Sequence, residues 1–221
     1  MSDLVQYFHQ GGSFMYAIAV VSAFGIAIII ERIIFIMFRY NTNGKAFMDQ
    51  IEKLIQQDSI DRAIKLCNAD QGAALCDVIK TGLVKANKSA EEIQNSVDET
   101  TLAVLPKLQK RTPYLAMIAN VATLLGLLGT IQGLIVAFQS INLEDAVSRS
   151  DALAQGIAIA MYTTAFGLIV AIPCMISHSI LQNKTIKIID EIDQYSVKLI
   201  NLLSIRQHSM KHQGETTGIV K

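Results

Sequence analysis

The fold of this chain is decided by the stretch Leu125-Gly126-Leu127-Leu128-Gly129-Thr130-Ile131-Gln132-Gly133. It lies within residues 114–141, a segment that contains no Asp, Glu, Lys, Arg or His. A helix over this segment would be roughly 42 Å long, which is enough to cross a bilayer with some tilt. The sequence therefore predicts a membrane-spanning helix here, over residues 113–141.

Small residues recur along this span at intervals of three and four positions. They are Ala122, Gly126, Gly129, Gly133 and Ala137. Residues at this spacing share one face of a helix, and small side chains on that face let a second helix approach closely. The polar exceptions in the segment are Thr130 and Gln132.

Two further apolar segments predict two more spans, over residues 13–38 and 152–183. The last of them carries its own stripe of small residues, formed by Gly156, Ala160, Thr163, Gly167 and Ala171. Pro173 lies inside this span, and because it removes a backbone hydrogen bond we expect a helix kink there.

The rest of the chain has the pattern of soluble helices. The sequence is 51% hydrophobic and 17% charged, so part of it must lie outside the membrane. Residues 39–112 place apolar residues at helical spacing, and Ser89 with Glu92 forms a predicted capping box. Residues 184–221 predict an amphipathic helix that packs on this module, followed by a loose polar tail from about His208.

Basic residues predict the orientation, because Lys and Arg next to spans collect on the cytoplasmic side. Those flanking the module and the last helix are Arg39, Lys45, Lys107, Lys110, Arg111, Lys184 and Lys187. The opposite side, formed by residues 1–12 and the loop 142–151, carries only Arg149. The predicted fold is thus an all-α membrane protein with three transmembrane helices, long cytoplasmic helical extensions, the N-terminus outside and the C-terminus inside.

No enzyme or metal constellation is visible in the sequence. The four His residues are scattered, the three Cys residues show no ligand spacing, and we expect no cofactor. Lys plus Arg and Asp plus Glu number 19 each, which gives no sign of a nucleic-acid partner. A membrane enzyme therefore lacks a candidate catalytic group. His178 reads as a polar group near the inner interface, with a proton-relay role as the alternative.

Hydroxyls are the remaining candidates for chemistry in the spans, on Thr130, Thr163 and Thr164. In one interpretation these threonines bond to their own helices and the glycines serve only helix packing. In the other, the hydroxyls coordinate a cation or hold a water chain, but they cannot take up and release a proton. A carboxylate would then have to come from another chain, with an oligomer of this one surrounding a partner's helix.

These residues resemble the MotA/TolQ/ExbB proton-channel family, and the three-span layout resembles its ExbB/TolQ branch. The similar segments are Gly11-Gly12, Glu31-Arg32, residues 126–133 of span two and residues 160–173 of span three. The resemblance implies an inner-membrane homo-pentamer around two copies of an ExbD/TolR-like single-span subunit, whose membrane Asp would titrate. It also implies that Thr130 and Thr164 line the pore, with Gly126, Gly129, Gly133, Gly156, Ala160 and Gly167 packing the helices around it.

Proton flow would then drive a rearrangement of the partner and pass work to a TonB-like, TolA-like or motility component.

Two departures from the family pattern matter. Ile159 stands where ExbB and TolQ carry a Glu, so a step that needs that charge does not carry over. Thr163 beside Thr164 resembles sodium-driven stators, so sodium coupling is a hypothesis beside the default of protons. The competing class of function is a membrane scaffold that binds partners without conducting ions.

Overall fold

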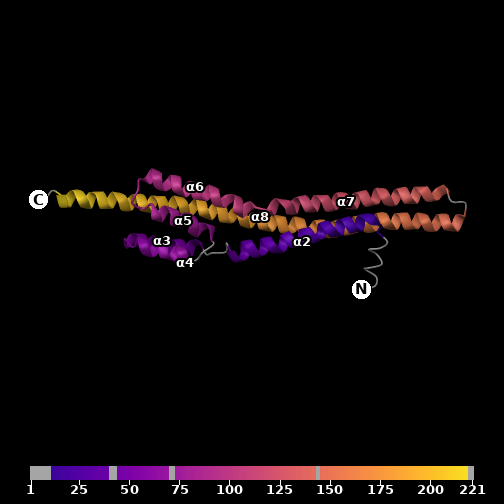
Figure 1. Cartoon of the computed structure of the whole chain (residues 1–221), viewed down its shortest axis with the longest axis horizontal. Coiled ribbons are helices and arrows are strands. Elements are labelled where there is room, and N and C mark those ends of the chain that lie inside the picture. The colour runs from indigo at the N-terminus through magenta and orange to yellow at the C-terminus, as the bar shows by residue number, and fades with distance from the viewer. Residues whose placement is uncertain (1–10, 40–43, 70–72, 143–144, 219–221) are drawn as a thin grey trace. The chain divides into compact units, whose positions relative to one another are not determined.

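The computed structural model describes residues 11–39, 44–69, 73–142 and 145–218. Its helices are α2 (Ser13–Arg39), α3 (Gly44–Gln56), α4 (Ile60–Ala69), α5 (Ala74–Val84), α6 (Ala90–Gln109), α7 (Thr112–Gln139), the 3₁₀ turn η1 (Ser140–Asn142) and α8 (Ala146–Gly218) (Figure 1). Three helical stretches are long and apolar enough to cross a membrane, at Ser13–Ile36, within Ala90–Gln139 and within Ala146–Ser209. The predicted all-α membrane fold is confirmed, whereas the orientation of the termini stays a prediction.

The chain divides into two compact units, which are described separately. The first, called here the membrane unit, comprises residues 1–32 and 111–181. The second, called the helical module, comprises residues 33–110 and 182–221. The predicted N-terminal segment 1–12 falls almost wholly outside the described residues.

A backbone break separates α6 from α7. Pro106 lies inside α6, and Pro113 lies in the first turn of α7. Between the two helices Arg111 adopts a left-handed conformation, with φ at 65°. Its guanidinium forms an ion pair with Glu31 of α2, a contact that no local sequence pattern indicated.

Helix α8 is longer at both ends than the sequence predicted. It begins at Ala146 rather than at residue 152, because the Asp145 carboxylate accepts hydrogen bonds from the Ser148 hydroxyl at 2.7 Å and from its N–H at 2.9 Å. These bonds hold the pKa of Asp145 below its ordinary value. The helix continues to Gly218, so the predicted loose tail from His208 was wrong. Pro173 lies inside the helix, and the kink stays a prediction.

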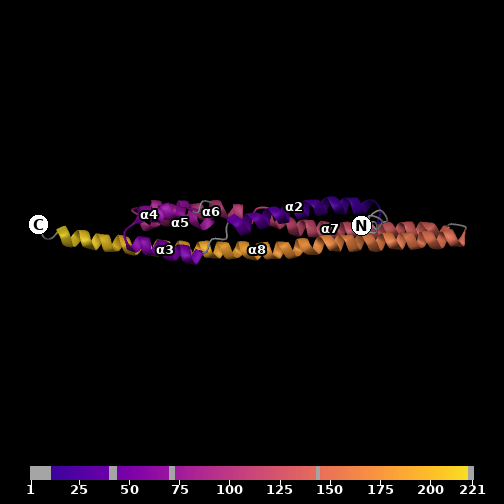
Figure 2. The ribbon, with the colours of Figure 1, turned by 90° about the horizontal axis from the view of Figure 1, so that it is seen from below.

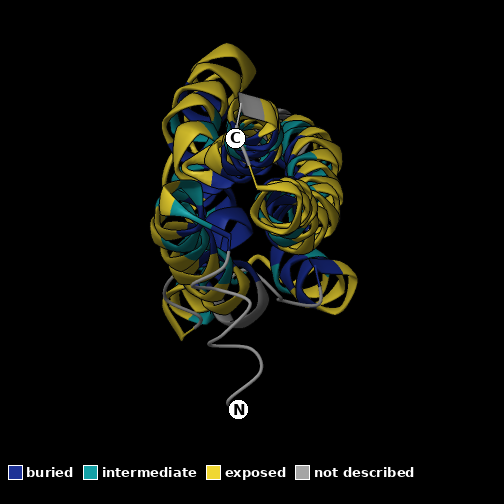
Figure 3. Ribbon diagram, turned by 90° about the vertical axis from the view of Figure 1, so that its right-hand side faces the viewer, coloured by how far each residue is buried: buried dark blue, intermediate teal, exposed yellow. Residues whose placement is uncertain are grey.

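The membrane unit is built from α2, α7 and the part of α8 before Leu181, which run side by side in two views (Figures 1 and 2). Its core consists of Ile18, Ile118, Ala119, Ala122, Val170, Ala171 and Cys174. Apolar side chains also cover the outside: Phe24, Phe138 and Met161 are each about two thirds exposed. Figure 3 shows buried residues in dark blue on inward sides and exposed ones in yellow outside. Such an all-round apolar surface is typical of helices that face lipid or other spans.

The helical module packs α3 to α6 against the later part of α8. Its core includes Met48, Ile51, Ile79 and Ile93 from the short helices, and Ile192, Leu199 and Leu203 from α8. This confirms the predicted packing of the C-terminal helix on the module. The predicted N-cap of α6 is also confirmed, because the Ser89 hydroxyl accepts a hydrogen bond from the Glu92 N–H at 3.2 Å.

Burial raises the pKa of the Cys67 thiol in α4 to about 11, from an ordinary value of 9.0. The folded module therefore holds this proton to a higher pH than the unfolded chain does. The contribution of the protonated thiol to the free energy of unfolding is complete below pH 9. It is lost as the pH rises to 11, and the total loss is about 2–3 kcal/mol. We expect urea titrations in detergent, followed by circular dichroism, to show this fall in wild type. A Cys67→Ala variant that lost the same amount over this range would contradict the assignment.

Candidate ion pathway

Helices α7 and α8 meet along the two stripes of small residues. A Cβ placed on Gly133 would lie 2.5 Å from the Gly156 carbonyl oxygen and 2.6 Å from the Ala160 nitrogen. One placed on Gly167 would lie 2.8 Å from the Ala122 carbonyl oxygen, and one on Gly126 would lie 3.2 Å from that of Thr163. The two backbones are therefore in direct contact, which only small residues permit. The structure thus brings the two predicted stripes together; their place at a pore stays a prediction.

Beside this contact, α7 and α8 form an open groove of about 450 Å³. It is lined by Thr130, Leu134, Ile157, Ala160, Met161, Thr164, Ala165 and Leu168. The only polar side chains among the described residues of this lining are Thr130 and Thr164, two of the three threonines that the sequence singled out as pathway residues. One comes from each helix, so the antiparallel pairing of α7 and α8 is what brings them to one surface.

Both groove hydroxyls donate hydrogen bonds to backbone carbonyls. The Thr130 hydroxyl donates to the Leu127 oxygen at 2.6 Å, and the Thr164 hydroxyl lies 3.0 Å from the Ala160 oxygen and 3.5 Å from the Gly126 oxygen. A hydroxyl that donates its proton in this way keeps lone pairs that can accept from water or coordinate a cation. Both residues are half-buried, and the accessible surface of the groove is almost wholly apolar.

Thr163 lies apart from this pair. Its side chain is fully buried, and its hydroxyl lies 2.9 Å from the Ile159 carbonyl oxygen and 3.1 Å from that of Ala160. It faces α7, where a Cβ on Gly129 would come within 2.3 Å of its Oγ1. Adjacent residues of a helix point about 100° apart, so Thr163 fills the helix contact while Thr164 faces the groove.

No titratable side chain is among the described residues that line the groove. Ile159 is half-buried on α8, and its Cγ2 would lie 3.8 Å from a Cβ on Gly12. His178 is half-buried further along α8 and is not part of the lining, so a proton-relay role for it stays a prediction. The described residues that line the groove therefore include two hydroxyls but no group that could exchange a proton.

One polar contact of the membrane unit was missed from the sequence. The Ser13 hydroxyl, at the first residue of α2, lies 3.5 Å from the side-chain oxygen of Gln132 in α7. Gln132 was recognised as a polar exception, but its partner lies far away in the sequence and no local pattern connects them. This hydrogen bond gives the amide a role in joining two spans.

Residues 69–194 match the model of a protein family described as the MotA/TolQ/ExbB proton channel family. The chain belongs to this family. Its relatives include an ExbB homolog of Methanothermobacter thermautotrophicus, 24% identical over 86% of this chain and 66% of that protein. The TolQ protein of the Haemophilus influenzae Tol-Pal system is 33% identical over 44% of each chain. These matches place this MotA/TolQ/ExbB family member on the ExbB/TolQ-like branch.

This family member spans less than two thirds of the length of these curated relatives. The solved structure of C. jejuni MotAB is also similar, with a TM-score of 0.64, 16% sequence identity and coverage of 86% of this chain and 75% of that one. At that identity the likeness shows a shared fold. The family is one of transport and channel subunits rather than of enzymes.

Proposed function

We propose that this protein is a channel subunit of an ion-driven complex in the bacterial inner membrane. In this proposal five copies enclose two single-span ExbD/TolR-like chains, and proton flow through the assembly energises a TonB-like, TolA-like or motility component. The observation that carries the proposal is the groove of α7 and α8, whose only polar side chains are Thr130 and Thr164. Membership in a proton-channel family supports the same reading.

The groove supplies half of a proton path. Its hydroxyls can hold a water chain beside a bound helix, and its apolar wall fits the side chains of a membrane span. A proton carrier must change charge within the path, so the titrating carboxylate belongs to the partner in this proposal. We propose protons rather than sodium, since the hydroxyl of Thr163 is buried in the contact with α7 and does not add to the groove.

A scaffold without ion conduction is the second candidate function. It is favoured by the fact that each threonine hydroxyl already bonds to a backbone carbonyl, as simple helix packing would require. The two functions differ in what they predict for near-isosteric replacements that leave packing intact.

The experiment replaces Thr130 and Thr164 by Val, singly and together, in the chain co-expressed with an ExbD/TolR-like single-span protein. We expect normal assembly by size-exclusion chromatography and at least about tenfold lower proton flux into proteoliposomes, because the water chain loses its polar contacts. Flux would be followed with a pH-sensitive dye at fixed membrane potential.

The matched control is Thr163→Val, which changes the same chemistry at the neighbouring residue outside the groove. It should assemble and conduct as wild type does, in sodium-free medium as well as in sodium. A wild-type complex that assembles but carries no proton flux would favour the scaffold, whereas unchanged flux in the Thr130 and Thr164 double variant would show that these two hydroxyls do not carry the path. Flux that required sodium and was lost in Thr163→Val would overturn the choice of protons.

A further inference from the structure

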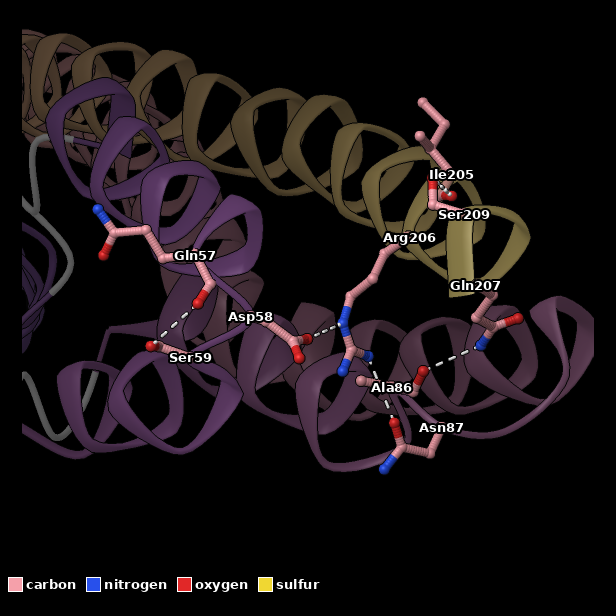
Figure 4. A network of polar contacts seen from close by, with 9 residues as sticks. All are labelled: Gln57, Asp58, Ser59, Ala86, Asn87, Ile205, Arg206, Gln207 and Ser209. Atoms are coloured by element: carbon pink, nitrogen blue, oxygen red, sulfur yellow. Dashed lines mark hydrogen bonds and ion pairs between the residues drawn. The ribbon is translucent and has the colours of Figure 1, made fainter. Parts of the chain in front are cut away.

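Beyond Leu203, the described side chains of α8 that hydrogen-bond to the short helices of the module are polar. The residues of α8 in the module's core end at Leu203, and the side chains that follow at Arg206 and Gln207 are polar. Figure 4 shows both of them pointing from α8 toward two turns of the short helices. These two residues therefore decide how the last described side chains of α8 are attached.

Arg206 joins the two turns to each other. Its Nε donates a hydrogen bond to the Asp58 carboxylate, in the turn between α3 and α4, at 2.7 Å. Its Nη1 donates to the Asn87 side-chain oxygen, in the turn between α5 and α6, at 3.3 Å (Figure 4). The side chain of Arg206 is 15% exposed, which places the guanidinium largely out of solvent although Asp58 is 68% exposed. A planar guanidinium suits such a two-pronged contact.

Gln207 is uncharged and contacts the turn between α5 and α6 through its side-chain amide. Its side-chain nitrogen donates to the carbonyl oxygen of Ala86 at 2.9 Å and to that of Lys88. Carbonyls just after the end of a helix lack partners within it, so this amide satisfies groups that α5 leaves open. The same turn is thereby contacted by two successive residues of α8.

Beneath these contacts lies a cavity of about 470 Å³. It is lined by both turns, by the start of α4, by the end of α5 and by Arg206. The turns are thus separated by open space rather than by packed side chains. Asp58 also holds a left-handed backbone, with φ at 57°, which is strained for a residue with a side chain. Releasing Arg206 would let this strained turn relax.

We propose that Arg206 and Gln207 form a latch that fastens the end of α8 to both turns at once. In the closed state the latch holds the two turns across the cavity. In the open state Arg206 and Gln207 release both turns, while the apolar contacts of α8 up to Leu203 stay in place. The latch is a conformational switch of the module that is separate from the groove in the membrane unit.

Hydrogen–deuterium exchange of the full-length protein in detergent tests this latch. In Arg206→Ala we expect about tenfold faster exchange in both turns, and no change in the core residues of α8. The matched control is Lys198→Ala, also on α8 and next to the core residue Leu199, which removes an ion pair of 2.7 Å to Glu52 of α3. That variant should leave exchange in the two turns as in wild type.

A second variant tests the contribution of the Asp58 charge by itself. Asp58→Asn keeps a residue that tolerates left-handed backbone but removes the carboxylate. In wild type, exchange in both turns should rise several-fold between low salt and about 1 M salt, because the pair is partly exposed and screened. In Asp58→Asn it should be fast at every salt concentration. The latch is overturned by faster exchange in one turn only, by faster exchange throughout the core, or by exchange independent of salt in wild type.

Discussion

Gly133→Val is expected to separate α7 from α8 and to destabilise the membrane unit by about 3 kcal/mol, the upper end of what overpacking usually costs. The atoms that a Cβ at this position would meet, the Gly156 oxygen and the Ala160 nitrogen, both belong to the backbone of α8. Neither can move aside as the end of a flexible side chain can, so the helices themselves must shift. The buried thiol of Cys174 offers a direct readout, since a thiol-reactive dye reports its exposure during heating.

For this measurement Cys67 and Cys76 are replaced by Ala, so that only the membrane unit contributes to the signal. The control is Leu124→Phe, which adds volume on the opposite side of α7, where the side chain is 59% exposed. We expect a clearly lowered melting temperature in Gly133→Val and little change in Leu124→Phe. Equal melting temperatures in the two variants would mean that the close backbone contact does not stabilise the unit.

Leu199→Ala is expected to have the second large effect and to lower the free energy of unfolding of the helical module by about 2–5 kcal/mol. Leu199 is fully buried, and its Cδ2 would lie 2.6 Å from a Cβ on Gly82 of α5. The leucine thus occupies the space that a side chain at Gly82 would need. The thiols of Cys67 and Cys76 report unfolding here, in a background with Cys174→Ala.

A double variant makes this prediction specific. Gly82→Ala alone should destabilise the module because its methyl group meets Leu199, whereas in Leu199→Ala the same methyl group fills part of the cavity. The double variant should therefore lose less stability than the sum of what the two single variants lose. Val197→Ala, at a position 60% exposed, serves as the control and should have little effect. Additive losses would show that the two residues do not share this space.

The three spans were predictable because length and lack of charge determine them, and both are local properties of the sequence. The packing of α7 on α8 was also foreseeable in part, since small residues at intervals of three and four can only form a smooth face. The sequence could not assign the two neighbouring threonines different surroundings. Thr163 and Thr164 have the same chemistry, and the position of α7 alone decides which of them is buried.

Other features depend on contacts between residues distant in the sequence. The ion pair of Glu31 with Arg111 and the contact of Arg206 with Asp58 each join segments that no local pattern relates. The helical continuation of α8 beyond His208 was missed because a polar composition suggested a loose chain. The polar composition of this segment indicates that a helix there has no apolar face to bury. It does not indicate whether the backbone continues as a helix.

The groove beside Thr130 and Thr164 has one more consequence. Because none of the described residues that line it can change its charge, a subunit made before its partner would lack the group that takes up and releases a proton under the proposed function. Surplus copies would then add no driven proton flow. The number of conducting units would be set by the supply of the partner chain, which is where the cell would have to exert control.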